Sequence, residues 1–118
     1  MKKLLIIEDD TDALEMVVFT FENGGFDVIQ TGKETTVEEI AALGPHIIII
    51  GYQLKGIPGN DICLKLKASA LTGHIPVILY SASVDIDKIP VNTCADGVIA
   101  QPYELEDFVY LVNRIALS

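Results

Sequence analysis

Three consecutive carboxylates near the start of the chain are the first residues whose type and spacing could do chemistry. Glu8, Asp9 and Asp10 directly follow a short aliphatic run. Glu8 and Asp9 predict at most a weak site for a divalent cation such as Mg²⁺, with no cofactor required. The favoured alternative is a solvated acidic patch in which two carboxylates share a proton, because close like charges raise a carboxylate pKa. Neither His46 nor His74 has a cysteine or acidic partner at ligand spacing, so we expect no metal at either.

A parallel sheet must position these carboxylates, because short aliphatic runs alternate with amphipathic stretches along the chain. The alternation predicts an α/β fold with one domain over residues 1–118 and helices on both faces of the sheet. The third run is apolar throughout, as a strand covered on both faces must be. The predicted strands are Lys3–Ile7, Phe26–Gln30, His46–Ile50, Pro76–Tyr80 and Val98–Ala100.

Local signals mark where the helices begin and end. Asn23-Gly24-Gly25 should end the first helix, because Asn and Gly tolerate the left-handed cap conformation. Thr36 and Glu39 have the spacing of a capping box. Asp10 and Asp12 should interact favourably with the N-terminus of the first helix. The predicted helices are Ala13–Glu22, a short one from Thr36 to about Leu43, Asn60–Ser69 and Glu104–Ala116.

Two stretches carry further expectations. The segment Ser83–Gly97 is irregular, and Pro90 should break any helix within it. The last helix has an apolar face that should point inward. Its members are Leu105, Phe108, Leu111, Val112 and Ile115.

The residues immediately after the strands should form the functional crevice, since ligands of an open parallel sheet bind outside the carboxyl ends of its strands. Ser81 follows the fourth strand, and it is either a ligand contact or a strand-end hydroxyl bonded to backbone. Gly56 and Gly59 lack the spacing and the Lys-Ser/Thr of a P-loop, so turn formation explains them better. The crevice would be lined by the residues that follow four of the strands, namely Glu8, Asp9 and Asp10, then Gly51, Tyr52 and Gln53, then Ser81, Ala82 and Ser83, and finally Gln101 and Pro102.

Five segments, in order and at suitable spacing, resemble the receiver domain of two-component response regulators. They are LLIIEDD at 4–10, PHIIII at 45–50, LKGIPG at 54–59, IPVILYSA at 75–82 and ADGVIAQPY at 95–103. The resemblance covers essentially the whole chain. It implies a doubly wound five-stranded parallel sheet in the flavodoxin-like order 2-1-3-4-5.

The resemblance also implies a mechanism and a role for each pocket position. In the family, an aspartate after the third strand accepts a phosphoryl group, and two acidic residues after the first strand help it to hold Mg²⁺. Those two are Glu8 and Asp9 here. A hydroxyl after the fourth strand, here Ser81, contacts the phosphoryl group, and a lysine before a proline supplies positive charge.

Two of these positions depart from the family's pattern. The acceptor position is Gly51, which has no carboxylate, and the lysine position is Gln101, which is neutral. A glycine cannot form an acyl phosphate, and a neutral amide cannot balance a phosphoryl charge. Asp85 and Asp96 are nearby carboxylates, but neither matches the acceptor position, so we do not expect them to replace it.

The family's switch and partner surface map onto the end of the chain. The switch aromatic corresponds to Val98, which has no ring to rotate. Gln101-Pro102 matches a Lys-Pro whose peptide bond is cis, and we expect cis here too, since turn geometry requires it. The usual partner surface would include Val98, Tyr103 and Tyr110, although helix packing explains both tyrosines equally well.

These observations predict a degenerate receiver that is not an enzyme and acts through protein–protein interaction in a two-component or phosphorelay pathway. Its partner would be a histidine kinase or a downstream signalling protein, and the chain would carry no output domain. One rival interpretation is a small-ligand-binding module with a flavodoxin-like fold. Another is a phosphoacceptor that uses a different carboxylate.

Composition narrows the partners further. The 118 residues contain 17 Asp and Glu against 8 Lys and Arg, and the net charge is −9. Repulsion from phosphate therefore opposes direct binding to nucleic acid or to an anionic membrane. Cys63 and Cys94 lie in apolar surroundings, which is typical of buried thiols in a reduced, cytoplasmic protein.

Overall fold

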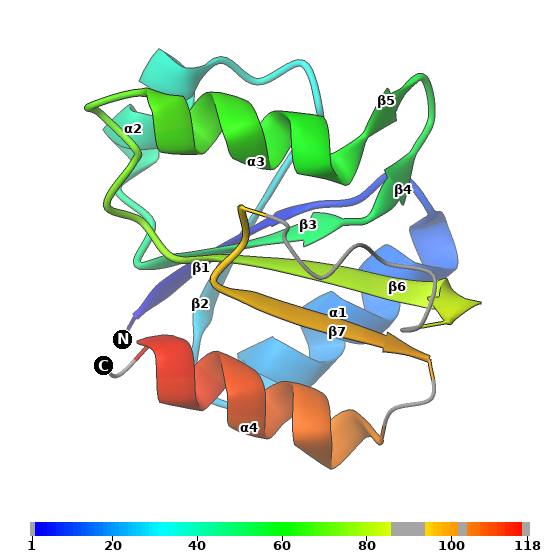
Figure 1. Ribbon diagram of the computed structural model, residues 1–118. Coiled ribbons are helices and arrows are strands. Elements are labelled where there is room, and N and C mark those ends of the chain that lie inside the picture. Colours follow the sequence, from blue (N-terminus) through cyan, green and yellow to red (C-terminus); the bar gives the residue numbers. More distant parts are fainter. Residues whose placement is uncertain (1, 86–93, 102–103, 117–118) are drawn as a thin grey trace.

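The computed structural model describes residues 2–85, 94–101 and 104–116, and a five-stranded parallel sheet forms their centre (Figure 1). The strand order is β2-β1-β3-β6-β7, which is the predicted order once the short hairpin strands are left out. The strands are β1 (Lys3–Ile7), β2 (Asp27–Thr31), β3 (Ile47–Gly51), β6 (Val77–Asp85) and β7 (Gly97–Gln101).

Helices cover both faces of the sheet, as predicted. Figure 1 shows α1 (Thr11–Asn23) and α4 (Leu105–Ala116) on one face and α2 (Val37–Leu43) and α3 (Gly59–Ala68) on the other. A two-stranded hairpin, β4 (Gln53–Leu54) and β5 (Ile57–Pro58), connects β3 to α3.

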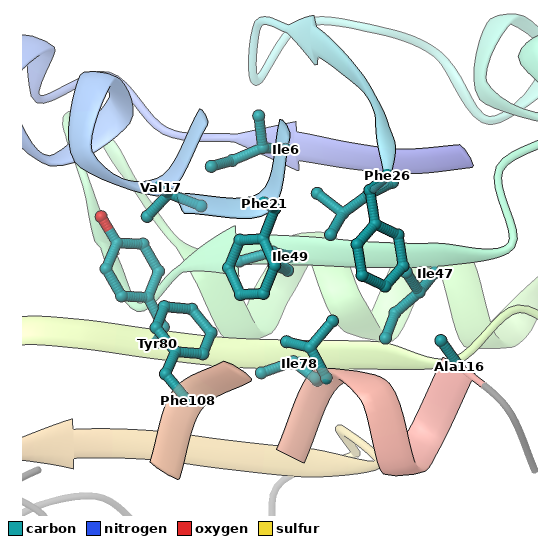
Figure 2. Close-up of a cluster of buried hydrophobic side chains, with 12 residues drawn as sticks. Ile6, Val17, Phe21, Phe26, Ile47, Ile49, Ile78, Tyr80, Phe108 and Ala116 are labelled. Atoms are coloured by element: carbon teal, nitrogen blue, oxygen red, sulfur yellow. The ribbon is translucent and has the colours of Figure 1, made fainter. Parts of the chain in front are cut away.

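The core divides into two apolar layers because successive strand residues point to opposite faces. Ile49 and Ile78 point toward α1 and α4, where they pack with Phe21 and Phe108 (Figure 2). Ile48 points toward α2 and α3. All five residues of β3 are buried, which is why its sequence shows no polar alternation.

Side chains and glycines close the helix ends as the sequence indicates. Oδ1 of Asp10 accepts a hydrogen bond from the Ala13 N–H at 3.1 Å and caps α1. Thr36 and Glu39 form the predicted capping box of α2. These hydrogen bonds, first the one from the Thr36 N–H, lower the pKa of the Glu39 carboxyl. Gly25, with φ +90°, provides the left-handed residue after α1.

Some sequence expectations were wrong in detail. The fourth long strand does not end at Tyr80, because β6 continues to Asp85. Leu105 does not point inward: it is 45% exposed. Cys63 is buried as expected, but Cys94 is partly exposed. The hairpin of β4 and β5 is not among the predicted strands, since strands of two residues leave no periodic signal.

Candidate functional site

Strand pairing brings three residues into one row: Glu8 just after β1, Gly51 at the end of β3, and Tyr80 within β6. Ile7 pairs with Ile50 across the sheet, so Glu8 leaves β1 level with Gly51, and Gly51 pairs with Tyr80. Alternation along each strand directs all three positions to the face that α1 and α4 cover. The row therefore crosses the sheet where β1 and β3 end, and ligands of an open parallel sheet bind at that end of the strands.

Glu8 spans this row and is held at both of its carboxylate oxygens. Oε1 accepts a hydrogen bond of 2.7 Å from the Tyr80 hydroxyl. Oε2 accepts bonds from the N–H groups of Asp9 at 3.0 Å and Asp10 at 3.2 Å. The ring of Tyr80 is itself fixed, because it is buried and stacks on Phe108 with ring centroids 5.5 Å apart (Figure 2).

The Glu8 carboxylate lies where a side chain of residue 51 would begin. A Cβ atom added to Gly51 would be 2.8 Å from Oε1 of Glu8 and 3.0 Å from its Cδ. These distances are shorter than van der Waals contact, so Glu8 keeps this position only because residue 51 is glycine. The missing side chain and the position of Glu8 are thus two parts of one arrangement.

Asp9 points away from this row, toward the hairpin of β4 and β5. Its Oδ2 accepts a hydrogen bond of 2.9 Å from the Lys55 N–H and pairs with Nζ of Lys33 at 3.2 Å. Lys33 Nζ also donates to the Lys55 carbonyl oxygen. Slight burial raises the pKa of Asp9, but the Lys55 N–H and the Lys33 ammonium outweigh it, and the pKa lies below its usual value.

The described residues do not fit a dedicated Mg²⁺ site. Mg²⁺ binds proteins through carboxylates together with several waters and, commonly, substrate phosphate. Both oxygens of Glu8 already accept protein hydrogen bonds, and an ammonium group already neutralises Asp9. Within residues 2–85, 94–101 and 104–116, no three potential metal-binding side chains come together. The weak Mg²⁺ site at Glu8 and Asp9 stays a prediction.

Glycine is required at two positions after β3, and the structural reason differs between them. Gly56 turns the hairpin with φ +80°, which confirms the turn interpretation. Gly59 begins α3 against the end of β3, and a Cβ there would lie 2.0 Å from the carbonyl oxygen of Gly51. Turn formation does not explain Gly59: close approach of two backbones does.

The structure places the other predicted pocket residues less completely. Ser81 is buried inside β6 beside Ala100, so it is not at a strand end. Gln101 is the last residue of β7, and its backbone pairs with Asp85. Pro102 and Tyr103, and with them the predicted cis peptide bond, lie outside the described residues.

The predicted partner residues do not share one face. The side chain of Val98 packs with the cluster on the α2 and α3 side, whereas Tyr110 is 67% exposed on α4. Tyr110 is therefore available to a partner, and Val98 is mainly a packing residue.

Asp96 cannot take the place of an acceptor at position 51. It lies where β6 begins, whereas Gly51 lies where β3 ends. Its Oδ2 accepts a hydrogen bond of 2.8 Å from the N–H of Val77, the first residue of β6. It also pairs with Nζ of Lys67 at 2.7 Å. Asp96 directly precedes β7, so it lies where the parallel strands begin and not where they end.

Two functional neighbours escaped the sequence analysis altogether. Lys33 and Tyr80 each contact an acidic residue far away in sequence, and neither belongs to a recognisable motif. Alternation within β6 could have placed Tyr80 on the same face as Ile78 and, by register, beside Gly51. No local signal points to Lys33, which lies in the loop after β2.

Comparison with known proteins agrees with this geometry, although no family model matches the chain. It is 29% identical over 118 residues to the DNA-binding dual master transcriptional regulator RpaA of Synechocystis, covering 98% of this chain and 49% of RpaA. A protein described as a response regulator from Chloroflexus aurantiacus has the same fold, with a TM-score of 0.78 and 27% identity. That match covers 99% of this chain and 98% of the other. The chain has the fold of receiver domains and is similar in sequence to response regulators.

The chain spans about half the length of the curated relatives it matches. A chain in the crystal structure of histidine kinase ThkA in complex with the response regulator protein TrrA also matches, with a TM-score of 0.76. At 15% identity over 98% of each chain, that likeness shows the fold alone. None of the helices described in this chain is long and apolar enough to cross a membrane.

Proposed function

We propose that this receiver domain has lost the aspartyl phosphoacceptor and signals through protein–protein interaction alone. The observation that carries the proposal is the Glu8 carboxylate over Gly51, held there by the Tyr80 hydroxyl. Glycine offers no nucleophile, and the space that an acceptor side chain would need is already occupied. The module would then be constitutive, or controlled by something other than an aspartyl phosphate.

The neighbouring ion pair supports the same conclusion. Lys33 holds its ammonium group against Asp9, so a positive charge of the protein itself already neutralises one of the two carboxylates expected at a metal. A phosphoryl group would also have to balance its charge without a lysine at position 101. Phosphotransfer would thus lack the acceptor carboxylate and the balancing lysine, and Asp9 is already paired with Lys33.

The partner we propose is a protein, either a histidine kinase or a downstream signalling protein. The complex of ThkA with TrrA is an example of such a pair among proteins of this fold. The net charge of −9 opposes direct contact with nucleic acid by the domain itself. Tyr110 on α4 is the exposed aromatic side chain that we expect at the interface.

Incubation with acetyl phosphate and Mg²⁺, followed by intact mass measurement, tests the loss of phosphotransfer. We expect no adduct under conditions in which a receiver with an acceptor aspartate is fully phosphorylated. A stoichiometric, hydroxylamine-labile phosphoryl adduct would overturn the proposal. If peptide mapping placed that adduct on Glu8, the carboxylate nearest to position 51 would be a replacement acceptor instead of a filler.

The interaction half of the proposal needs its own measurement. Calorimetric titration with a purified candidate partner should give the same affinity with and without acetyl phosphate. Tyr110→Ala should weaken binding, and Tyr110→Phe, which keeps the ring, is the matched control. A partner that binds only after treatment with the phosphodonor would contradict the proposal.

A further inference from the structure

Two cysteines that are far apart in the sequence meet just before β7. Cys63 is fully buried on α3, and Cys94 is partly exposed in the segment that leads into β7. Sγ of Cys94 lies 3.8 Å from Oδ1 of Asn60, which is three residues before Cys63 on α3. Both side chains belong to the apolar cluster on the α2 and α3 side of the sheet.

Further contacts hold the segment before β7 against α3. Asn60, Cys63 and Lys67 are spaced three and four residues apart, so they form one stripe along the helix. The contact between Cys94 and Asn60 lies at one end of this stripe. At the other end of the stripe, Lys67 pairs with Asp96 at 2.7 Å. The position of one thiol relative to the other is therefore set by contacts on both sides of the pair.

The two thiols differ in reactivity. Burial, and then the neighbouring Cys94 thiol, raise the pKa of the Cys63 thiol above its usual value. The thiolate is the form that attacks a disulfide, and access to solvent decides which sulfur meets a dissolved reagent. Cys94 is thus the thiol that reacts first, and Cys63 is the thiol beside it that can react second.

We propose that Cys63 and Cys94 form a reversible disulfide in the presence of a low-molecular-weight disulfide, and that this bond fastens the start of β7 to α3. In the first step the Cys94 thiolate attacks one sulfur of oxidised glutathione, and one glutathione leaves as a thiolate. In the second step the sulfur of Cys63 attacks Cys94, and the second glutathione leaves. The protein loses two electrons and two protons, and two molecules of reduced glutathione carry them.

Such a bond would act on the edge of the sheet. β7 is the last strand in the order and pairs only with β6 among the described strands. A covalent link at its start would close the chain between residues 63 and 94 into a loop, which restricts the unfolded state. The disulfide would thus change how firmly the start of β7 is attached to α3, and it would do so without a phosphoryl group.

Treatment of the native protein with oxidised glutathione tests the inference. We expect a mass loss of about 2 Da and no remaining thiol that iodoacetamide can alkylate. Tryptic peptides 56–65 and 89–114 should be found cross-linked. The Tm should rise by about 5–15 °C, and dithiothreitol should reverse the rise.

Two variants assign the roles. Cys63→Ala should stop at one bound glutathione on Cys94, and Cys94→Ser should leave Cys63 unmodified in the folded protein. A stable glutathione adduct on Cys94 of the unmutated protein would overturn the inference, because Cys63 would then not react. Two thiols that both stay free, or a dimer linked through Cys94, would overturn it as well.

Discussion

Replacing Gly51 by aspartate should drive Glu8 out of its position at the end of β3. The new Cβ would lie 2.8 Å from Oε1 of Glu8 and 3.0 Å from its Cδ, and the flexible Glu8 side chain can move more easily than the strands. This movement breaks the 2.7 Å hydrogen bond from the Tyr80 hydroxyl to Glu8. The Glu8 carboxylate and the new carboxylate at position 51 then lie near each other. We expect the free energy of unfolding to fall by about 1.5–3 kcal/mol, the contribution of a hydrogen bond to a charged group.

A double-mutant cycle with Tyr80→Phe isolates this bond. The substitution removes only the hydroxyl and leaves the ring stacked on Phe108. In the wild type it should cost about 1.5–3 kcal/mol, because it removes the bond to Glu8. In the Gly51→Asp background the bond to Glu8 is already absent, so the same substitution should cost about 1.5–3 kcal/mol less than in the wild type. Tyr110→Phe, at an exposed tyrosine, is the matched control and should be neutral in both backgrounds.

Urea unfolding followed by far-UV circular dichroism gives these free energies, and an unchanged m-value shows that only stability changed. Millimolar Mg²⁺ adds a second readout. It should stabilise the Gly51→Asp variant more than the wild type, because the variant has a third carboxylate beside Glu8 and Asp9. An equal cost of Tyr80→Phe in both backgrounds would refute the reasoning, since Glu8 would then not have left Tyr80.

Three further predictions concern the surroundings of the site. Asp10→Ala removes the N-cap of α1 and should lower the free energy of unfolding by about 1 kcal/mol in urea unfolding. Because pairing lowers the pKa of Asp9, the stability it contributes is present above the unfolded value of 3.8 and is lost as the pH falls through the folded pKa. Lys33→Met should therefore raise the pKa of Asp9 in an NMR titration. It should also make the free energy of unfolding depend less on pH in the acid range. An unchanged pKa would contradict the pairing. Phe108→Ala removes the ring beneath Tyr80 and should cost about 3–5 kcal/mol by the same unfolding assay, whereas Tyr110→Ala on the same helix should cost little.

Most of the fold could be predicted because each segment carries its own signal. The isoleucines of β3 require cover on both faces, and the capping residues Thr36 and Glu39 mark the start of α2. Errors arose where tertiary contact overrides local pattern. Leu105 has the period of the buried face of α4, but it lies in the first turn of the helix and is exposed there. β6 continues past Tyr80 because β7 pairs with it as far as Asp85.

The sequence by itself determined that the residue at position 51 has no carboxylate and that the residue at position 101 is not a lysine. A glycine at position 51 and a glutamine at position 101 are chemical facts that no folding can change, and the hydrophobic pattern determines where along the strands they lie. Only the tertiary structure decided what occupies the empty place. Glu8 reaches across Gly51 to Tyr80 from a strand that is 72 residues away in the chain, and Lys33 reaches Asp9 across 24. Such contacts depend on strand register and on which side chains face each other, and these properties appear only when distant segments pack together.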